Sequence, residues 1–265
     1  MAENDGFVSL DFVFHVDFME PLRERDPDLH AKVKDLSLEE FVNRVMDQRE
    51  RADPFLLFKA EYKEAEKSIR RRESIHWKEM LANLSFAMNY PAKHFSAEDM
   101  QRLVNVLKPL ISIVIASVPQ ESADEIIALY DAGKLEMVAV DADSKVKPEE
   151  GGGITYSYTD ENKVVRQTRY QTFIDCTGQP ELSLRDFPFN SMPDQGTISQ
   201  ARLAFRSEEA AIKEINSGNK DVQQQSDGKY YLKVPGIAIT DSFQVVENNG
   251  KVNNRIYIVA VPFIG

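Results

Sequence analysis

The sequence contains little cysteine and no long apolar run. Its single cysteine, Cys176, excludes an intramolecular disulfide and any metal site built from several cysteines. The longest apolar stretch, "LISIVIASV" from Leu110, is about half the length needed to span a bilayer. A basic start followed by an apolar core, the pattern of a signal peptide, is also missing. We therefore expect a cytoplasmic protein with no membrane partner.

The sequence has fewer basic than acidic residues. Lys and Arg number 32 against 43 Asp and Glu, which gives a formal net charge of -11 and a pI near 5.0. A general nucleic-acid binder needs a basic stripe to displace phosphate counterions, so this class of partner is excluded. The 42% hydrophobic content is sufficient for a substantial core.

The sequence lacks the glycine-rich loop that would hold a phosphate. A dinucleotide site needs glycines between a strand and a helix, so that backbone amides can approach the pyrophosphate. The only glycine cluster, Gly151 to Gly153, precedes an apparent strand and no helix follows it. We expect a hairpin connection there.

The sequence contains no recognised pattern of metal ligands. Asp141 and Asp143 resemble the start of a calcium loop, but Val146 and Gly152 occupy the positions that need glycine and glutamate. The four histidines show no paired-ligand spacing; they are His15, His30, His76 and His94. We predict no metal site, and we interpret the basic run from Arg70 to Arg72 as a salt-bridged helix surface.

The N-terminal half is predicted to be mainly helical. Ser37 and Glu40 have capping-box spacing, which places a helix from there to about Arg51. Further helices are predicted from Lys59 to Met88 as one long helix ended by Pro91, from Ser96 through Leu107 with an interruption at Pro109, and from Pro119 to Gly133. The β-branched run after Pro109 fits either a kinked continuation or a buried strand, and we favour helix.

After Gly133 strand and turn patterns replace the helical ones. "KLEMVAV" alternates like a strand, and hairpins are predicted around residues 160–162 and around the Asn249-Gly250 pair. The fold class is α/β in the mixed α+β sense, with a helical subdomain followed by a β-rich, dinucleotide-binding-like and incomplete sheet. We divide it into residues 1–133, mainly helical with an N-terminal strand in "FVSLDFVFHV", and residues 134–265, mainly strands.

The stretch "TFIDCTGQP" predicts an apolar strand that ends at a turn. Phe173 and Ile174 are expected to bury the strand, Asp175 and Thr177 to hydrogen-bond turn amides, and Gly178 to allow close backbone approach. Cys176 is either an activated thiol or a small buried residue, and the second reading is favoured.

The order "FIDCTGQP", "VPGIAITDSFQVV", "RIYIVAVPFIG" resembles the C-terminal half of FAD/NAD(P)-binding flavoproteins, the group of N-hydroxylating and flavin-containing monooxygenases and disulfide reductases. "PQESADEIIALYDAGKLEMVAV" is similar to the helix and strand that precede this region, so the resemblance covers residues 119–265. It implies a cofactor-facing Thr-Gly turn from Asp175 to Gly178, followed by Gln179, with Cys176 in place of the usual alanine. It further implies that Asp241 is the acid after the Gly236 strand and that Gly265 begins a flavin-facing turn.

The resemblance implies a piece of a soluble FAD/NAD(P)-binding oxidoreductase that transfers hydride from nicotinamide to flavin. The family's N-terminal Gly-x-Gly-x-x-Gly unit is missing, so we expect FAD and NAD(P) to bind in the parent protein and not in this piece. A chain cut at both ends should expose sheet edges and self-associate. The alternative is a non-enzymatic α/β module that binds a protein.

Overall fold

The computed structural model describes residues 6–140, 143–160, 162–178 and 182–259. They fall into two units, the first made of Met1–Val118 with Glu181–Gly265 and the second of Pro119–Pro180. The expected boundary after Gly133 lies inside the second unit. Helices and small antiparallel sheets occur together, which confirms the mixed α+β class.

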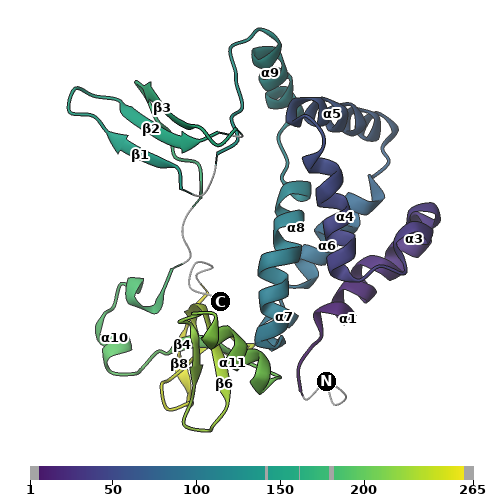
Figure 1. The fold of residues 1–265 in the computed structure, drawn as a ribbon. Coiled ribbons are helices and arrows are strands. Elements are labelled where there is room, and N and C mark those ends of the chain that lie inside the picture. Colours follow the sequence, from purple (N-terminus) through teal and green to yellow (C-terminus); the bar gives the residue numbers. More distant parts are fainter. Residues whose placement is uncertain (1–5, 141–142, 161, 179–181, 260–265) are drawn as a thin grey trace. The chain divides into compact units, whose positions relative to one another are not determined.

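The N-terminal part of the first unit is helical (Figure 1). Side chains at Ser9, Asp26, Ser37, Asp53 and Ser96 cap helices, each accepting a free backbone N–H of the first turn. The helices are α1 (Leu10–Phe14), η2 (His15–Met19), α2 (Glu20–Arg25), α3 (Pro27–Val33), α4 (Leu38–Glu50), α5 (Pro54–Arg71), α6 (His76–Ala87), η3 (Pro91–His94), α7 (Ala97–Arg102), η4 (Leu103–Leu107) and α8 (Lys108–Ile115).

The capping box predicted at the start of α4 is confirmed, because Ser37 and Glu40 each accept the other's backbone N–H. The N-terminal strand was a wrong prediction. Apart from an isolated bridge between Val8 and Phe95, that apolar segment is helical from Leu10 onward. Buried residues recur along it at helical steps of three and four, and this periodicity determined the structure; they are Leu10, Val13, Phe14, Phe18 and Leu22.

Two helices widen into a π-helical turn just before a proline. η2 precedes Pro21, and η4 precedes Pro109. Proline has no N–H to donate, and its ring collides with the carbonyl four residues earlier. A single wider turn accommodates this, and the helix then continues. The helical interpretation of the run after Pro109 is therefore confirmed as α8.

The single long helix predicted from Lys59 to Met88 is wrong, because it is divided into α5 and α6. Arg72 has a left-handed backbone with φ +57°, and its N–H and that of Glu73 return to carbonyls of the last turn of α5. This is a C-terminal cap in which arginine stands where glycine is common. Only Phe55 of α5 is buried.

The largest core belongs to these helices alone. All its buried members lie between Leu10 and Val114. At its centre the rings of Phe14, Phe18 and Phe41 have centroids 5.0 to 5.6 Å apart. Fully burying one such side chain contributes about 1.5–3 kcal/mol, so this cluster is a major source of stability.

The C-terminal part of the first unit adds two small sheets. The strands are β4 (Gln200–Ala204), β5 (Val222–Gln224) and β6 (Tyr230–Ile237) in the antiparallel order β4-β6-β5, and the hairpin β7 (Gln244–Val246) with β8 (Val252–Tyr257). Short helices η5 (Leu184–Asp186), α10 (Ser191–Asp194) and α11 (Glu208–Asn216) lie beside them. The hairpin predicted around Asn249-Gly250 is confirmed as β7 and β8.

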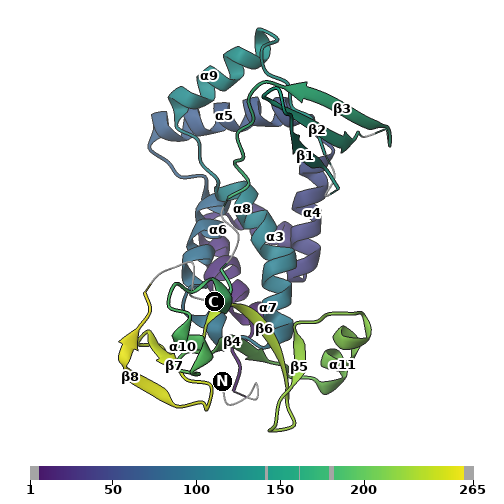
Figure 2. The same cartoon turned by 90° about the vertical axis from the view of Figure 1, so that its left-hand side faces the viewer.

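The sheet of β4, β5 and β6 packs on the end of α7 (Figure 2). Ala97 of α7 belongs to the same buried cluster as Leu203, Phe205 and Leu232. An ionic network, which we call the α7 joint, lies beside this apolar contact. Its members are Glu98, Asp99, Arg102 and Arg206.

Asp99 is the buried centre of the α7 joint. Asp99 is 4% exposed, and its carboxylate accepts hydrogen bonds from Arg102 at 3.0 Å and from Arg206 at 2.9 Å. Glu98 accepts the backbone N–H groups of Arg206 and Ser207, which precede α11. The joint therefore ties the helical core to residues more than a hundred positions later in the chain.

Arg102 also connects the α7 joint to two other helices. It donates two hydrogen bonds to Asp11 of α1, at 2.7 and 2.8 Å, and two to Glu39 of α4, at 2.6 and 3.1 Å. These hydrogen bonds lower the pKa of both carboxyl groups and raise that of the guanidinium. One arginine thus binds three carboxylates from three helices.

The second unit contains α9 (Gln120–Asp131) and the antiparallel sheet β1 (Lys145–Pro148), β2 (Ile154–Thr159) and β3 (Val165–Tyr170). The predicted helix after Pro119 and the hairpin around residues 160–162 are confirmed. Gly151 to Gly153 form the β1–β2 connection, as expected, and a side chain at Gly153 would collide with the backbone carbonyl of Tyr170. These glycines serve a hairpin.

The strand predicted over residues 134–140 does not form in this chain. That segment pairs with no described strand, and every residue in it is exposed. A strand needs a neighbour to satisfy its N–H and C=O groups, and none is present in the described part of the chain. The same part forms three small antiparallel sheets and no parallel one.

Among the described residues, no single helix is both long and apolar enough to cross a membrane; Ala97–Ile115 and Gln120–Asp131 meet that test only when taken together.

Candidate functional site

The turn from Asp175 to Gly178 has the local geometry expected from its sequence. Oδ1 of Asp175 accepts the hydroxyl of Thr177 at 2.6 Å and its backbone N–H at 2.9 Å. These two bonds, the hydroxyl first, lower the pKa of Asp175. Gly178 has φ +89°, and no atom of the described residues lies within 4 Å of the place where its Cβ would be. The turn is therefore preorganised and open on the glycine side.

The segment leading into this turn is exposed, contrary to prediction. β3 ends at Tyr170, so Phe173 and Ile174 lie beyond the sheet and are 46% and 76% exposed. Cys176 is exposed too, which makes its interpretation as a buried residue wrong. The reason is the register: Tyr170 pairs with Ile154, the first residue of β2, and no described strand continues past it.

Asp241 lies in a tight turn between β6 and β7. Its carboxylate contacts Lys93 at 2.5 Å and His94 at 3.5 Å, and accepts the hydroxyl of Tyr90 at 3.2 Å. The hydrogen bond from Lys93 is the main reason that the pKa of Asp241 is lowered. All three partners come from the helical part of the first unit.

Asp241 and the turn at Asp175 to Gly178 belong to different units. The other two predicted cofactor residues, Gln179 and Gly265, lie outside the described residues. The partners of Asp241 were missed at the sequence level because they precede it by roughly 150 positions. A useful signal would have been the short "YPAKH" stretch, where tyrosine, lysine and histidine surround a proline turn.

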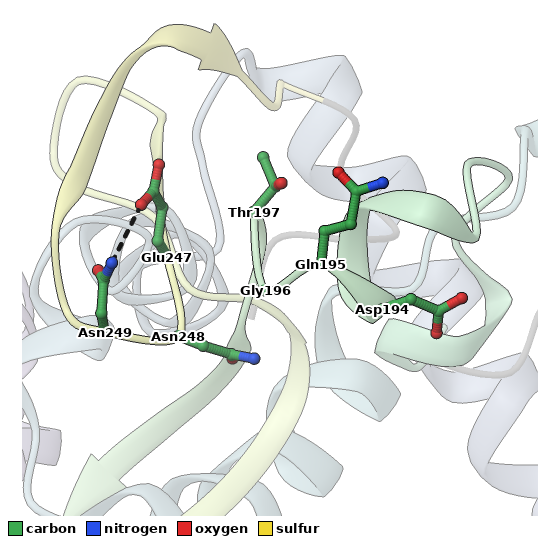
Figure 3. Close-up of a pocket in the computed structure, with 7 residues that line it drawn as sticks. All are labelled: Asp194, Gln195, Gly196, Thr197, Glu247, Asn248 and Asn249. Atoms are coloured by element: carbon green, nitrogen blue, oxygen red, sulfur yellow. Dashed lines mark hydrogen bonds between the residues drawn. The ribbon is translucent and has the colours of Figure 1, made fainter.

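A polar hollow of about 370 Å³ lies where α10 meets the β7–β8 hairpin (Figure 3). The backbone N–H of Asn248 donates to the carbonyl of Gly196, and Gly196 has φ +71°. Glu247 accepts from Asn249 and Asn253 at 3.4 and 2.9 Å. Asp194 points away from Glu247 in the close-up, so the two carboxylates do not converge on one ligand position (Figure 3).

Metal-binding clusters are also missing from the described residues. No three His, Cys, Asp or Glu side chains gather there in a way that could hold an ion. Of the two acids that resemble the start of a calcium loop, Asp141 and Asp143, the first lies outside the described part.

Two comparisons with known proteins find a similarity to this chain. The family model described as "YdhS-like middle domain" matches residues 1–115, the range that contains the helical core. A protein of Escherichia coli (strain K12) called "Uncharacterized protein YdhS" is 26% identical over 188 residues, which are 70% of this chain and 34% of that protein. The chain thus spans about a third of the length of this relative. No solved structure matches the chain.

Proposed function

We propose that the chain is an interior portion of a cytoplasmic FAD/NAD(P)-binding oxidoreductase, and that its second unit contributes strands to the cofactor-binding sheet of the parent protein. The observation that carries this proposal is the exposure of two strand-like segments. Residues 134–140 precede the β1–β3 sheet in the sequence, and residues 172–176 follow it. Both are rich in apolar residues and all their residues are exposed, and the ring of Phe173 stacks on Tyr156 of β2 with centroids 6.5 Å apart.

The residue pattern of these segments fits strands buried on both faces. In "KLEMVAV", Leu135 and Met137 alternate with Val138 and Val140, so apolar side chains project to both sides. In "TFIDC", Phe173 and Ile174 do the same. Short apolar runs such as residues 137–140 are typical of inner strands of parallel sheets, and charged residues interrupt the remainder of the two segments at Glu136 and Asp175. The second segment ends in the open turn at Gly178, as the flavoprotein resemblance implies for a cofactor-facing strand.

The described residues do not themselves fit a dinucleotide. The only glycine cluster serves the β1–β2 hairpin, and no other strand, glycine turn and helix follow one another with that spacing in the described residues. The pyrophosphate cradle would have to come from another part of the parent protein, and the length of the E. coli relative leaves room for one. The isolated chain should accordingly bind neither FAD nor NADPH more tightly than about 10 μM.

A protein-binding module remains the second candidate, because exposed apolar patches also mark protein interfaces. Self-association of the isolated chain through a sheet edge is expected under either proposal, and the charges on both outer strands should weaken it: Lys145 and Lys147 on β1, and Arg166 and Arg169 on β3.

The test is flavin content in the full-length parent protein. It should purify with bound flavin, seen in its visible absorbance, and the Gly178→Val variant should lose that flavin. Gly228→Val is the matched control, because Gly228 also has a positive φ and open space but lies in the β5–β6 hairpin. A full-length protein that binds neither FAD nor NADPH at about 10 μM would overturn the proposal and favour the binding module.

A further inference from the structure

Helix α5 leaves a groove between itself, α4 and α6. Phe55, in its first turn, is the one buried residue of α5, and the remainder of this helix is half-buried or exposed. The groove has a volume of about 370 Å³, within the range of small-molecule sites. Its apolar lining consists of Val45, Leu57, Ala60 and Trp77.

The charged groups around the groove are paired with one another. Arg49 of α4 donates to both carboxylate oxygens of Glu61 on α5, at 2.6 and 3.4 Å. Lys78 of α6 contacts Glu61 at 3.5 Å and Glu64 at 3.2 Å. Burial raises the pKa of Glu61, but Arg49 and Lys78 outweigh this and lower it, so the carboxylate stays ionised.

This pairing determines which ligands the groove favours. An anion would compete with Glu61 for Arg49, and a cation would compete with Lys78 for the two glutamates. Either exchange leaves one partner of an existing pair without its counter-charge, which is costly in a partly buried place. A neutral molecule displaces only water from the apolar lining and leaves the pairs intact.

We propose that this groove binds a neutral, mainly apolar small molecule of one or two rings, which lies against Trp77 and Leu57. The lining offers an aromatic face and branched aliphatic side chains, and its ion pairs disfavour either sign of charge. The groove is formed only by helices of the first unit, so this proposal can be tested independently of the cofactor proposal.

Trp77 provides a local probe because it is the only tryptophan in the chain. Its indole N–H should give a single cross-peak in a ¹H–¹⁵N spectrum of the intact protein. Naphthalene, a neutral two-ring probe, should shift this peak in a saturable way. Its anionic analogue naphthalene-1-sulfonate should bind there about tenfold more weakly or not at all, because Arg49 and Lys78 are already paired with glutamates.

A variant that fills the groove tests the location. Ala60→Phe places a ring in the groove at an exposed helical position, so the fold should survive while the shift of the Trp77 peak is lost. Lys63→Phe is the matched control, an exposed position of the same helix outside the lining, and it should keep the shift. The proposal is overturned if the neutral probe leaves the peak unmoved, if the sulfonate binds equally well, or if Ala60→Phe behaves like Lys63→Phe.

Discussion

Replacing Asp99 by asparagine would remove the central charge of the α7 joint while keeping the shape of the side chain. The carboxylate holds two guanidinium groups, at 3.0 Å from Arg102 and 2.9 Å from Arg206. An amide can accept from one of them at most with a weaker neutral oxygen, and its NH₂ group faces the other cation.

The expected cost follows from burial. Removing one partner of a fully buried ion pair costs about 3–5 kcal/mol. Here the arginine side chains are 28% and 35% exposed, and Arg102 keeps Asp11 and Glu39, so part of the loss is recovered from water and from those carboxylates. We therefore expect Asp99→Asn to lower the free energy of unfolding of the first unit by about 2–3 kcal/mol.

Urea denaturation, monitored by circular dichroism, measures this change in the free energy of unfolding. Asp28→Asn is the control, because Asp28 is an exposed acid near the start of α3. The control should change stability by less than about 0.5 kcal/mol. A double-mutant cycle with Arg206→Met should give a coupling of about 1–2 kcal/mol. If Asp99→Asn were indistinguishable from Asp28→Asn, the joint would contribute no net stability and the reasoning above would be refuted.

Three further predictions concern the caps, the acid range and the open turn. Ser37→Ala should destabilise the first unit by about 1 kcal/mol, because it removes one half of the capping box of α4, and thermal denaturation that shows no change would contradict this. Asp11 and Glu39 have pKa values lowered chiefly by the hydrogen bonds from Arg102, and at Glu98 burial raises the pKa while the N–H groups of Ser207 and Arg206 outweigh it. Lowered folded-state pKa values contribute stability at neutral pH, and this stability is lost as the pH falls below about 4.5. In urea titrations at several pH values, the free energy of unfolding should therefore fall less steeply with decreasing pH in Arg102→Met than in the unchanged protein. Equal slopes for the two proteins would count against the network. Gly178→Val should destabilise the second unit by about 1–3 kcal/mol, since φ +89° strains a branched side chain, and amide hydrogen exchange of β3 unaltered by the substitution would argue that the turn simply rearranges.

Local signals in the sequence predicted local structure well. The capping box at Ser37, the cap at Ser96 and the hairpins beside residues 160–162 and Asn249 depend on neighbouring residues, and all four occur. Long-range features were not predictable. The end of α5 depends on a left-handed backbone at Arg72, a conformation that sequence patterns associate with glycine, and the α7 joint depends on residues that meet only after folding.

The candidate site shows the same division. The hydrogen bonds of Asp175 to Thr177 and the positive φ of Gly178 follow from short-range preferences, and both are present. The burial of Phe173, Ile174 and Cys176 was predicted wrongly, because an apolar run indicates only that a segment favours a covered position. Whether another strand covers it depends on parts of the structure beyond the run itself.

The confinement of the helical core to residues 10–114 has a consequence for synthesis on the ribosome. Every buried member of that core is made before the second unit begins, so the helices can pack while the remainder of the chain is still being translated. At about 5–20 residues per second, roughly 5–20 s separate the emergence of α8 from that of Arg206. During this interval Asp99 has Arg102 as its partner but not yet Arg206, and the end of α7 faces water. The nascent protein therefore spends seconds as a folded helical core with an acidic, partly apolar docking face still open.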